Sequence, residues 1–266
     1  MVAGIAIPKP LRTAVLGFLA AQARIELGEA EYSLEEYSSL DAFFTRRLKP
    51  GSRSFPSDPG VVGSPCDGIV CQSGVATAGD MLQAKGKRYS LEALFEDAKQ
   101  AAQFVDGCYV TIYLSPRNYH RVHFAAKGIV TGCRHIPGGL WPVNPRLASR
   151  LDGLFAKNER VVTYQDTGFG RVATVMIGAA GVGSIELAYC RDGNGSTRQS
   201  VGQLMSFVPG VAVNQGDELG VFHLGSTVVM IFEPGAARLE PLVPGQPICL
   251  GTPIARAPDG RGRSVQ

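Results

Sequence analysis

Short runs of apolar residues recur along most of the chain, and they predict strands more often than helices. From about residue 60 these runs are rich in valine, isoleucine and phenylalanine and are separated by glycine-containing turns, which is typical of short β-strands. Residues 90–105 differ, because their apolar positions follow helical spacing and Ser90 can cap a helix there. The pattern predicts an α+β fold that is mainly β, with antiparallel sheets of short strands and a few helices.

The N-terminal region contains a predicted amphipathic helical segment within residues 10–32. Apolar side chains fall near helical spacing at Leu11, Val15, Phe18, Leu19, Ala23 and Leu27. The mostly apolar stretch between Arg12 and Arg24 is far shorter than the roughly 20 residues that span a bilayer. Such a helix either packs on its own domain or lies in a membrane interface, and both interpretations stay open. Residues 40–56 predict a short helix followed by a linker.

An interrupted strand pattern near the C-terminus is the most unusual feature of the chain. Residues 222–235, FHLGSTVVMIFEPG, have the composition of a sheet interior except at Gly225, Ser226 and Thr227. Glycine inside a strand pattern marks a bulge or a close backbone approach. Ser226 therefore either follows a bend or presents its hydroxyl for chemistry.

Composition narrows the class of protein without identifying it. The chain has 266 residues, of which 45% are apolar and 18% charged, so it can bury a full core, either as one large domain or as one domain with appendages. A net charge of +3 is too small to argue for nucleic acid as a partner, and it is compatible with weak attraction to an anionic surface. The six cysteines form no CxxC pair, which favours free thiols in a reducing compartment.

Two histidines carry the candidate chemistry, in the stretch YHRVH of residues 119–123. His120 and His123 could be a metal pair, two structural histidines, or the source of a base that activates a hydroxyl. The third interpretation needs a serine and an orienting carboxylate, and Ser226 and Asp67 could supply them. Ser226 lacks the GxSxG nucleophile elbow, so a standard hydrolase fits poorly.

Several separated motifs together resemble the phosphatidylserine decarboxylase family. They are DAFFTRRLKPGSRSF (41–55), PCDG (65–68), LQAKGKRYSLEALF (82–95), YHRVH (119–123), LFAKNERV (154–161), GAAGVGSIE (178–186) and LGST (224–227). The resemblance covers roughly residues 40–235 in the expected order. Cys66 departs from it, because a small residue such as alanine is expected before Asp67.

The resemblance implies a proenzyme that cuts its own chain between Gly225 and Ser226. Asp67, His123 and Ser226 would form the triad for self-cleavage, and Ser226 would become a pyruvoyl group that forms a Schiff base with the substrate amine. His120 would assist decarboxylation or reprotonation. The implied reaction converts phosphatidylserine to phosphatidylethanolamine and carbon dioxide in phospholipid biosynthesis, without pyridoxal phosphate (PLP) or a metal.

The same resemblance implies an organisation and a set of partners. Residues 1–40 would form a membrane-facing helical segment and residues 41–255 the catalytic domain, while the polar, breaker-rich composition of residues 256–266 predicts a flexible tail. Cleavage would give a beta chain of residues 1–225 and an alpha chain of residues 226–266. The expected partners are phosphatidylserine, an anionic membrane surface and a second copy in a homodimer, with no nucleic acid, at the cytoplasmic face of the cell membrane.

Two other function classes remain as alternatives. A serine amidase or esterase would stay a single chain. A lipoyl or biotinyl carrier domain is suggested by the hairpin rhythm of residues 208–226, but such a module carries its group on a lysine. The last lysine of the chain is Lys157, which argues against the carrier.

Overall fold

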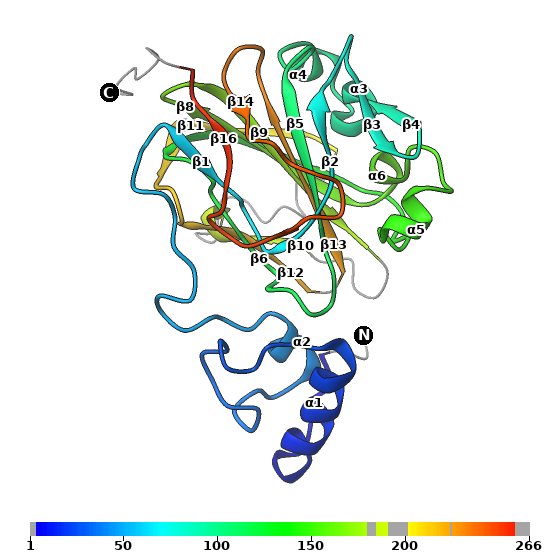
Figure 1. The fold of residues 1–266 in the computed structure, drawn as a ribbon, viewed down its shortest axis with the longest axis vertical. Coiled ribbons are helices and arrows are strands. Elements are labelled where there is room, and N and C mark those ends of the chain that lie inside the picture. Colours follow the sequence, from blue (N-terminus) through cyan, green and yellow to red (C-terminus); the bar gives the residue numbers. More distant parts are fainter. Residues whose placement is uncertain (1–3, 180–184, 191–201, 224, 259–266) are drawn as a thin grey trace.

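An antiparallel eight-stranded sheet forms the centre of the molecule (Figure 1). The structure is a computed structural model and describes residues 4–179, 185–190, 202–223 and 225–258. In spatial order, the strands of the central sheet are β11 (Leu204–Val213), β7 (Gly128–Ile136), β8 (Arg160–Thr167), β9 (Gly170–Gly178), β13 (Ser226–Phe232), β5 (Cys108–Leu114), β2 (Gly68–Val75) and β15 (Pro247–Ile248).

Smaller sheets and helices lie around and beside this central sheet (Figure 1). The smaller sheets are β1 (Val61–Gly63), β16 (Pro253–Arg256) and β14 (Arg238–Leu239); β10 (Ile185–Leu187), β12 (Glu218–Phe222) and β6 (Arg121–His123); and the hairpin β3 (Asp80–Ala84) with β4 (Lys87–Ser90). The helices are α1 (Lys9–Ala23), α2 (Leu40–Phe44), α3 (Leu91–Phe95), α4 (Ala98–Ala102), α5 (Pro145–Ala148), α6 (Leu154–Lys157) and the 3-10 turn η2 (Ala188–Cys190). The predicted fold, α+β and mainly β with antiparallel sheets, is confirmed.

Strand β13 lies between β9 and β5, and all seven of its residues are buried. Its side chains alternate between two apolar clusters on opposite faces of the sheet. Val228 and Met230 belong to one cluster, whereas Val229 and Ile231 belong to the other. Burial on both faces explains why the sequence of β13 is continuously apolar rather than alternating. By the same alternation, Ser226 shares the face of Val228 and Met230.

The interrupted pattern at residues 222–235 is a boundary between two strands. Strand β12 ends at Phe222 in the β10–β12–β6 sheet, and β13 begins at Ser226 in the central sheet. The interpretation of one interrupted strand was therefore wrong. Gly225, at the boundary, has a φ of 24°, in the region that favours glycine.

Two helical predictions need shorter boundaries. The helix predicted over residues 90–105 is two helices, α3 and α4, because Glu96 adopts a left-handed conformation and Asp97 caps α4. The predicted cap is confirmed, since the Ser90 hydroxyl accepts a hydrogen bond from the Ala93 amide at 3.0 Å. At the N-terminus, α1 ends at Ala23 rather than continuing toward residue 32, because Arg24 adopts a left-handed φ of 56°.

The N-terminal region, which contains α1, α2 and the residues between them, forms a small N-terminal unit at one end of the molecule, below the β10–β12–β6 sheet in Figure 1. Its own apolar cluster contains Leu16, Ala20, Tyr37 and Phe43. Within the described residues, no helix is long and apolar enough to cross a membrane. Residues 259–266 of the predicted tail, together with Leu224 and residues 180–184 of two motifs, lie outside the described residues.

Candidate active site

Ser226 is a buried serine whose hydroxyl has no hydrogen-bond partner among the described residues. Its backbone is fixed from both sides, since it pairs with Leu114 of β5 and with Gly178 of β9. A buried hydroxyl without a partner is unfavourable in a folded protein, so such a group calls for an explanation. The preceding glycine, with its positive φ, has no side chain to shield its carbonyl carbon.

His123 ends β6 and is held through its backbone and both ring nitrogens. Its amide donates to the Pro65 carbonyl at 2.8 Å, which ties β6 to the turn that contains Asp67. Ring Nδ1 lies 2.8 Å from the Gly216 carbonyl, which can only accept, so Nδ1 carries the proton. Nε2 then has the lone pair and accepts from the Tyr119 hydroxyl at 3.1 Å. Burial lowers the pKa of His123, so its neutral, basic form is favoured.

His120 is completely buried immediately before β6. Its Nδ1 donates to the Asn118 carbonyl at 2.8 Å, and its ring packs on Phe44 with the ring centroids 3.9 Å apart. Nε2 is buried and has no partner within the described part of the chain. Burial lowers the pKa of His120 to about 3, and the nearby Arg46 charge adds to this effect. The ring is therefore neutral at pH 7 and its unpaired Nε2 is a hydrogen-bond acceptor.

Asp67 lies in the turn before β2 and is 5% exposed. Arg53 binds both of its oxygens, with Nε 2.9 Å from Oδ1 and Nη2 2.7 Å from Oδ2. The Leu250 amide donates to Oδ1 at 2.7 Å. The carboxylate is thus buried and paired with a cation.

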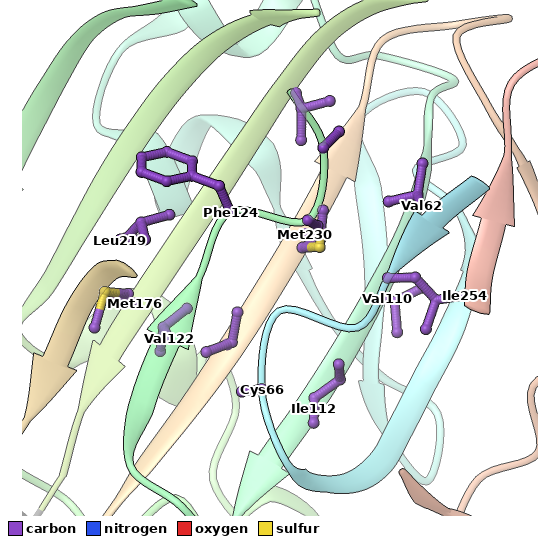
Figure 2. Close-up of a cluster of buried hydrophobic side chains, with 14 of the residues drawn as sticks. Val62, Cys66, Val110, Ile112, Val122, Phe124, Met176, Leu219, Met230 and Ile254 are labelled. Carbon is purple, nitrogen blue, oxygen red and sulfur yellow. The ribbon is translucent and has the colours of Figure 1, made fainter. Parts of the chain in front are cut away.

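The three residues predicted as a triad lie on elements that meet over one face of the central sheet. Cys66, next to Asp67, and Val122, next to His123, pack in the same cluster as Met230 of β13 (Figure 2). The Asp67 charge reaches His123 and favours its protonation. Within the described residues, however, no hydrogen bond joins Asp67 to His123 or His123 to Ser226. The arginine and the Leu250 amide occupy the carboxylate, and Gly216 and Tyr119 occupy the imidazole.

Residues 41–53 contact Asp67 and segments close to the other candidate residues, which the sequence did not indicate. His223, which lies three residues before Ser226, donates from Nδ1 to the Asp41 carboxylate at 2.9 Å. Arg46 donates to the carbonyl of Arg117 at 3.1 Å, in the loop that carries His120. The basic run 46–53 was visible in the sequence, but its partners are brought close only by folding.

Cys66, the departure from the family pattern, packs into the core without exposing its thiol. The side chain is fully buried in the cluster of Figure 2, and burial raises its pKa well above the ordinary range. The backbone carbonyl of Cys66 accepts a hydrogen bond from the Ser64 hydroxyl at 2.7 Å. The side chain at position 66 therefore contributes apolar packing to the turn, and Asp67 keeps its own partners.

The candidate reactive side chains of the site are those of Ser226, His123, His120 and Asp67. In the described ranges, no group of three or more histidine, cysteine, aspartate or glutamate side chains is placed to hold a metal ion. Ser226, whose hydroxyl is buried and has no partner among the described residues, is a candidate nucleophile, and the neutral His123 is a candidate base.

Comparison with known proteins gives one consistent result. The sequence profile of the family described as phosphatidylserine decarboxylase matches residues 40–256. The chain is 42% identical to the phosphatidylserine decarboxylase proenzyme of Anaeromyxobacter sp. (strain K), across 94% of this chain and 89% of that protein. The proenzyme of Myxococcus xanthus (strain DK1622) is also 42% identical, across 86% of this chain and 81% of its own length. The proenzyme of Halorhodospira halophila (strain DSM 244 / SL1) is 42% identical, across 94% of this chain and 85% of that protein.

Proposed function

Because the chain belongs to the phosphatidylserine decarboxylase family, which makes it a carboxy-lyase, we propose that it cuts itself between Gly225 and Ser226 and then decarboxylates phosphatidylserine. The observation that carries this proposal is the Ser226 hydroxyl, which is fully buried, has no partner among the described residues and directly follows a glycine at positive φ. The product is phosphatidylethanolamine, and the reaction belongs to phospholipid biosynthesis.

The proposed self-cleavage begins with attack of Ser226 Oγ on the carbonyl carbon of Gly225. His123 takes the hydroxyl proton on Nε2 and returns it to the Ser226 nitrogen as the peptide C–N bond breaks, which leaves an ester. Loss of the Ser226 α-proton expels the Gly225 carboxylate and leaves dehydroalanine. After tautomerisation to an imine, water releases ammonia, so residue 226 ends as a ketone at a new N-terminus.

The pyruvoyl group formed at position 226 would supply an electron sink for the loss of carbon dioxide. The buried, unpartnered hydroxyl at this position fits that role, because the group would form inside the protein, away from bulk water. Asn118 and Phe44 fix the ring of His120, and its Nε2 has no partner among the described residues. His120 can therefore accept a proton at Nε2 and give it up again during decarboxylation.

The purified chain should separate into fragments of 225 and 41 residues, the second number being 266 minus 225. Denaturing electrophoresis and intact mass spectrometry would measure both. The smaller fragment should resist Edman degradation, because a ketone replaces its N-terminal amine. A single uncut chain with an ordinary serine would contradict the proposal and favour a serine amidase or esterase.

We also propose that the protein binds the membrane surface peripherally through α1. Leu11, Val15 and Phe18 are 52%, 39% and 64% exposed on this helix, while Leu16 and Ala20 pack inward. Three exposed apolar side chains within two turns suit a helix lying in the lipid interface. Phosphatidylserine carries acyl chains, so an active site that faces the bilayer would shorten the path of the substrate from the membrane into the site.

Phe18→Asp should weaken binding to vesicles that contain anionic lipid by about ten-fold, because burying a phenylalanine side chain contributes about 1.5–3 kcal/mol. Cosedimentation with vesicles measures this. Val75→Asp is the matched control. Val75 is 54% exposed but pairs with Cys108 at the opposite end of β5 from Leu114, the partner of Ser226. Equal loss of binding in both variants would remove α1 from the membrane contact.

A further inference from the structure

Arg53 joins two carboxylates that come from different parts of the chain. Its Nε and Nη2 bind Asp67, while Nη1 and Nη2 bind the Glu29 oxygens at 2.8 and 2.9 Å. Nη1 also donates to the Ser52 carbonyl at 2.8 Å. These contacts use all five N–H donors of the guanidinium. A residue this fully engaged holds its partners in one geometry.

The same contacts attach the self-cleavage carboxylate to the N-terminal unit. Glu29 lies between α1 and α2, and its carbonyl accepts from the Lys49 amide at 2.9 Å. Asp67 immediately precedes β2 of the central sheet. Arg53 is therefore the ionic bridge between the N-terminal unit and the turn that carries Asp67.

The contacts of Arg53 with Asp67 conflict with the proposed role of Asp67 as the carboxylate that orients His123. A carboxylate that orients a histidine base must accept a hydrogen bond from its ring, yet His123 Nδ1 donates to Gly216 instead. Asp67 meanwhile accepts from Arg53 and from the Leu250 amide. The uncut chain thus has its proposed nucleophile, base and carboxylate on elements that share one apolar cluster, but Arg53 and the Leu250 amide hold the carboxylate.

We propose that Arg53 is a positioning residue for self-cleavage, which holds Asp67 away from His123 until its contacts with Asp67 loosen. This inference rests on the proposed self-cleavage of Gly225–Ser226. Glu29 shares the guanidinium with Asp67, so it weakens the hold of Arg53 on Asp67. The placement of the N-terminal unit thereby sets the rate at which the chain cuts itself.

Two substitutions should change that rate in opposite directions. Arg53→Lys keeps the positive charge but cannot bind a carboxylate through two parallel N–H groups, so cleavage should become about three-fold faster or more. Glu29→Gln leaves the cation of Arg53 to Asp67 alone, so cleavage should become about three-fold slower or more. Timed cell-free synthesis of the full-length chain, followed by electrophoresis, measures both rates from the moment each chain is made.

The pH dependence of cleavage adds a readout that damage to the fold would not move. The groups that face the His123 ring are Tyr119, the Gly216 carbonyl, Glu218, Arg121 and Asp67. When Arg53→Lys releases the Asp67 carboxylate toward this ring, the imidazolium is stabilised and the pKa of His123 rises. Because the base must be neutral, the acid limb of the rate profile should move to higher pH in this variant.

Arg171→Lys is the matched control, since Arg171 is a more exposed arginine that pairs with Asp166 at 3.1 Å. Arg53→Gln is a second variant for the case that Arg53→Lys folds poorly, as judged by its melting temperature. If both Arg53 variants cut at or below the wild-type rate, the inference is overturned. If Glu29→Gln cuts at the wild-type rate, Glu29 does not affect the hold of Arg53 on Asp67, and that part of the inference is overturned. A wild-type chain that never cuts would instead refute the proposed function.

Discussion

Replacing His123 with alanine should leave the chain at its full length of 266 residues. His123 Nε2 is the basic nitrogen, because Nδ1 donates its proton to the Gly216 carbonyl. Without this base, Ser226 must attack as an unactivated hydroxyl, and general-base assistance is worth about 100 to 10,000-fold in rate. Asp67→Asn should also slow cleavage strongly, since a neutral amide cannot stabilise the imidazolium that forms. A time course of electrophoresis measures the residual rate.

The control for this experiment is a histidine outside the site. His135 in β7 bonds Glu159 at 2.9 Å, so His135→Gln changes a buried imidazole without touching the proposed base. This variant should cut at the wild-type rate. Normal cleavage of His123→Ala would show that another group activates Ser226.

The rate of self-cleavage should depend on pH as expected for a buried histidine base. Burial lowers the pKa of His123 from its ordinary value of 6.5, so the neutral form persists below that pH. The rate should therefore stay constant from pH 8 down to about 6.5 and fall only at lower pH. Quenched time points at a series of pH values would measure it, and a fall that begins above pH 7 would contradict the assignment.

The sequence predicted those features that depend on neighbouring residues. The apolar composition around Ser226 predicted a sheet interior, and β13 is a buried strand of the central sheet. Ser90 predicted a helix cap by its position alone, and it caps α3. Local preference and tertiary packing agree at these positions, so pattern was sufficient.

Other features depend on the backbone conformation of single residues. Arg24 and Glu96 end their helices in the left-handed conformation, which is unusual for residues of their types, so the apolar spacing overestimated both helices. Strand β12 and strand β13 lie in different sheets although three residues separate them. Sequence pattern could not show that Gly225 adjoins a change of sheet rather than a bulge.

The hydrogen-bond and ion-pair partners of the site residues could not be predicted from the sequence, for a different reason. Asp67 and Arg53 are both conspicuous in the sequence, yet nothing in their spacing indicates that they pair. The carbonyl of Gly216 holds His123 from 93 residues away in the chain. A backbone carbonyl has no signature in the sequence, because every residue has one. The candidate residues could therefore be named from the sequence, but their resting arrangement could not.

Replacing His120 should separate the two stages of the proposed activity. His120 is fully buried, and its Nε2 has no partner in the described part of the chain, whereas His123 has Tyr119 at its Nε2. His120→Ala should still give both fragments and the blocked smaller chain, because the self-cleavage base is intact. His120→Gln, which is closer in volume, guards against loss of packing on Phe44.

The effect of both His120 variants should appear in the release of carbon dioxide. Decarboxylation leaves a carbon of the substrate in need of one proton, and a pKa of about 3 means that a protonated His120 gives its proton up readily. An anionic headgroup nearby would raise that pKa and let the ring take a proton first. Loss of this relay should slow release from phosphatidylserine labelled in its serine carboxylate by about 100 to 10,000-fold. Uncut His120→Ala alongside normally cut His123→Ala would reverse the two assignments, and full activity in both would leave neither imidazole with a catalytic role.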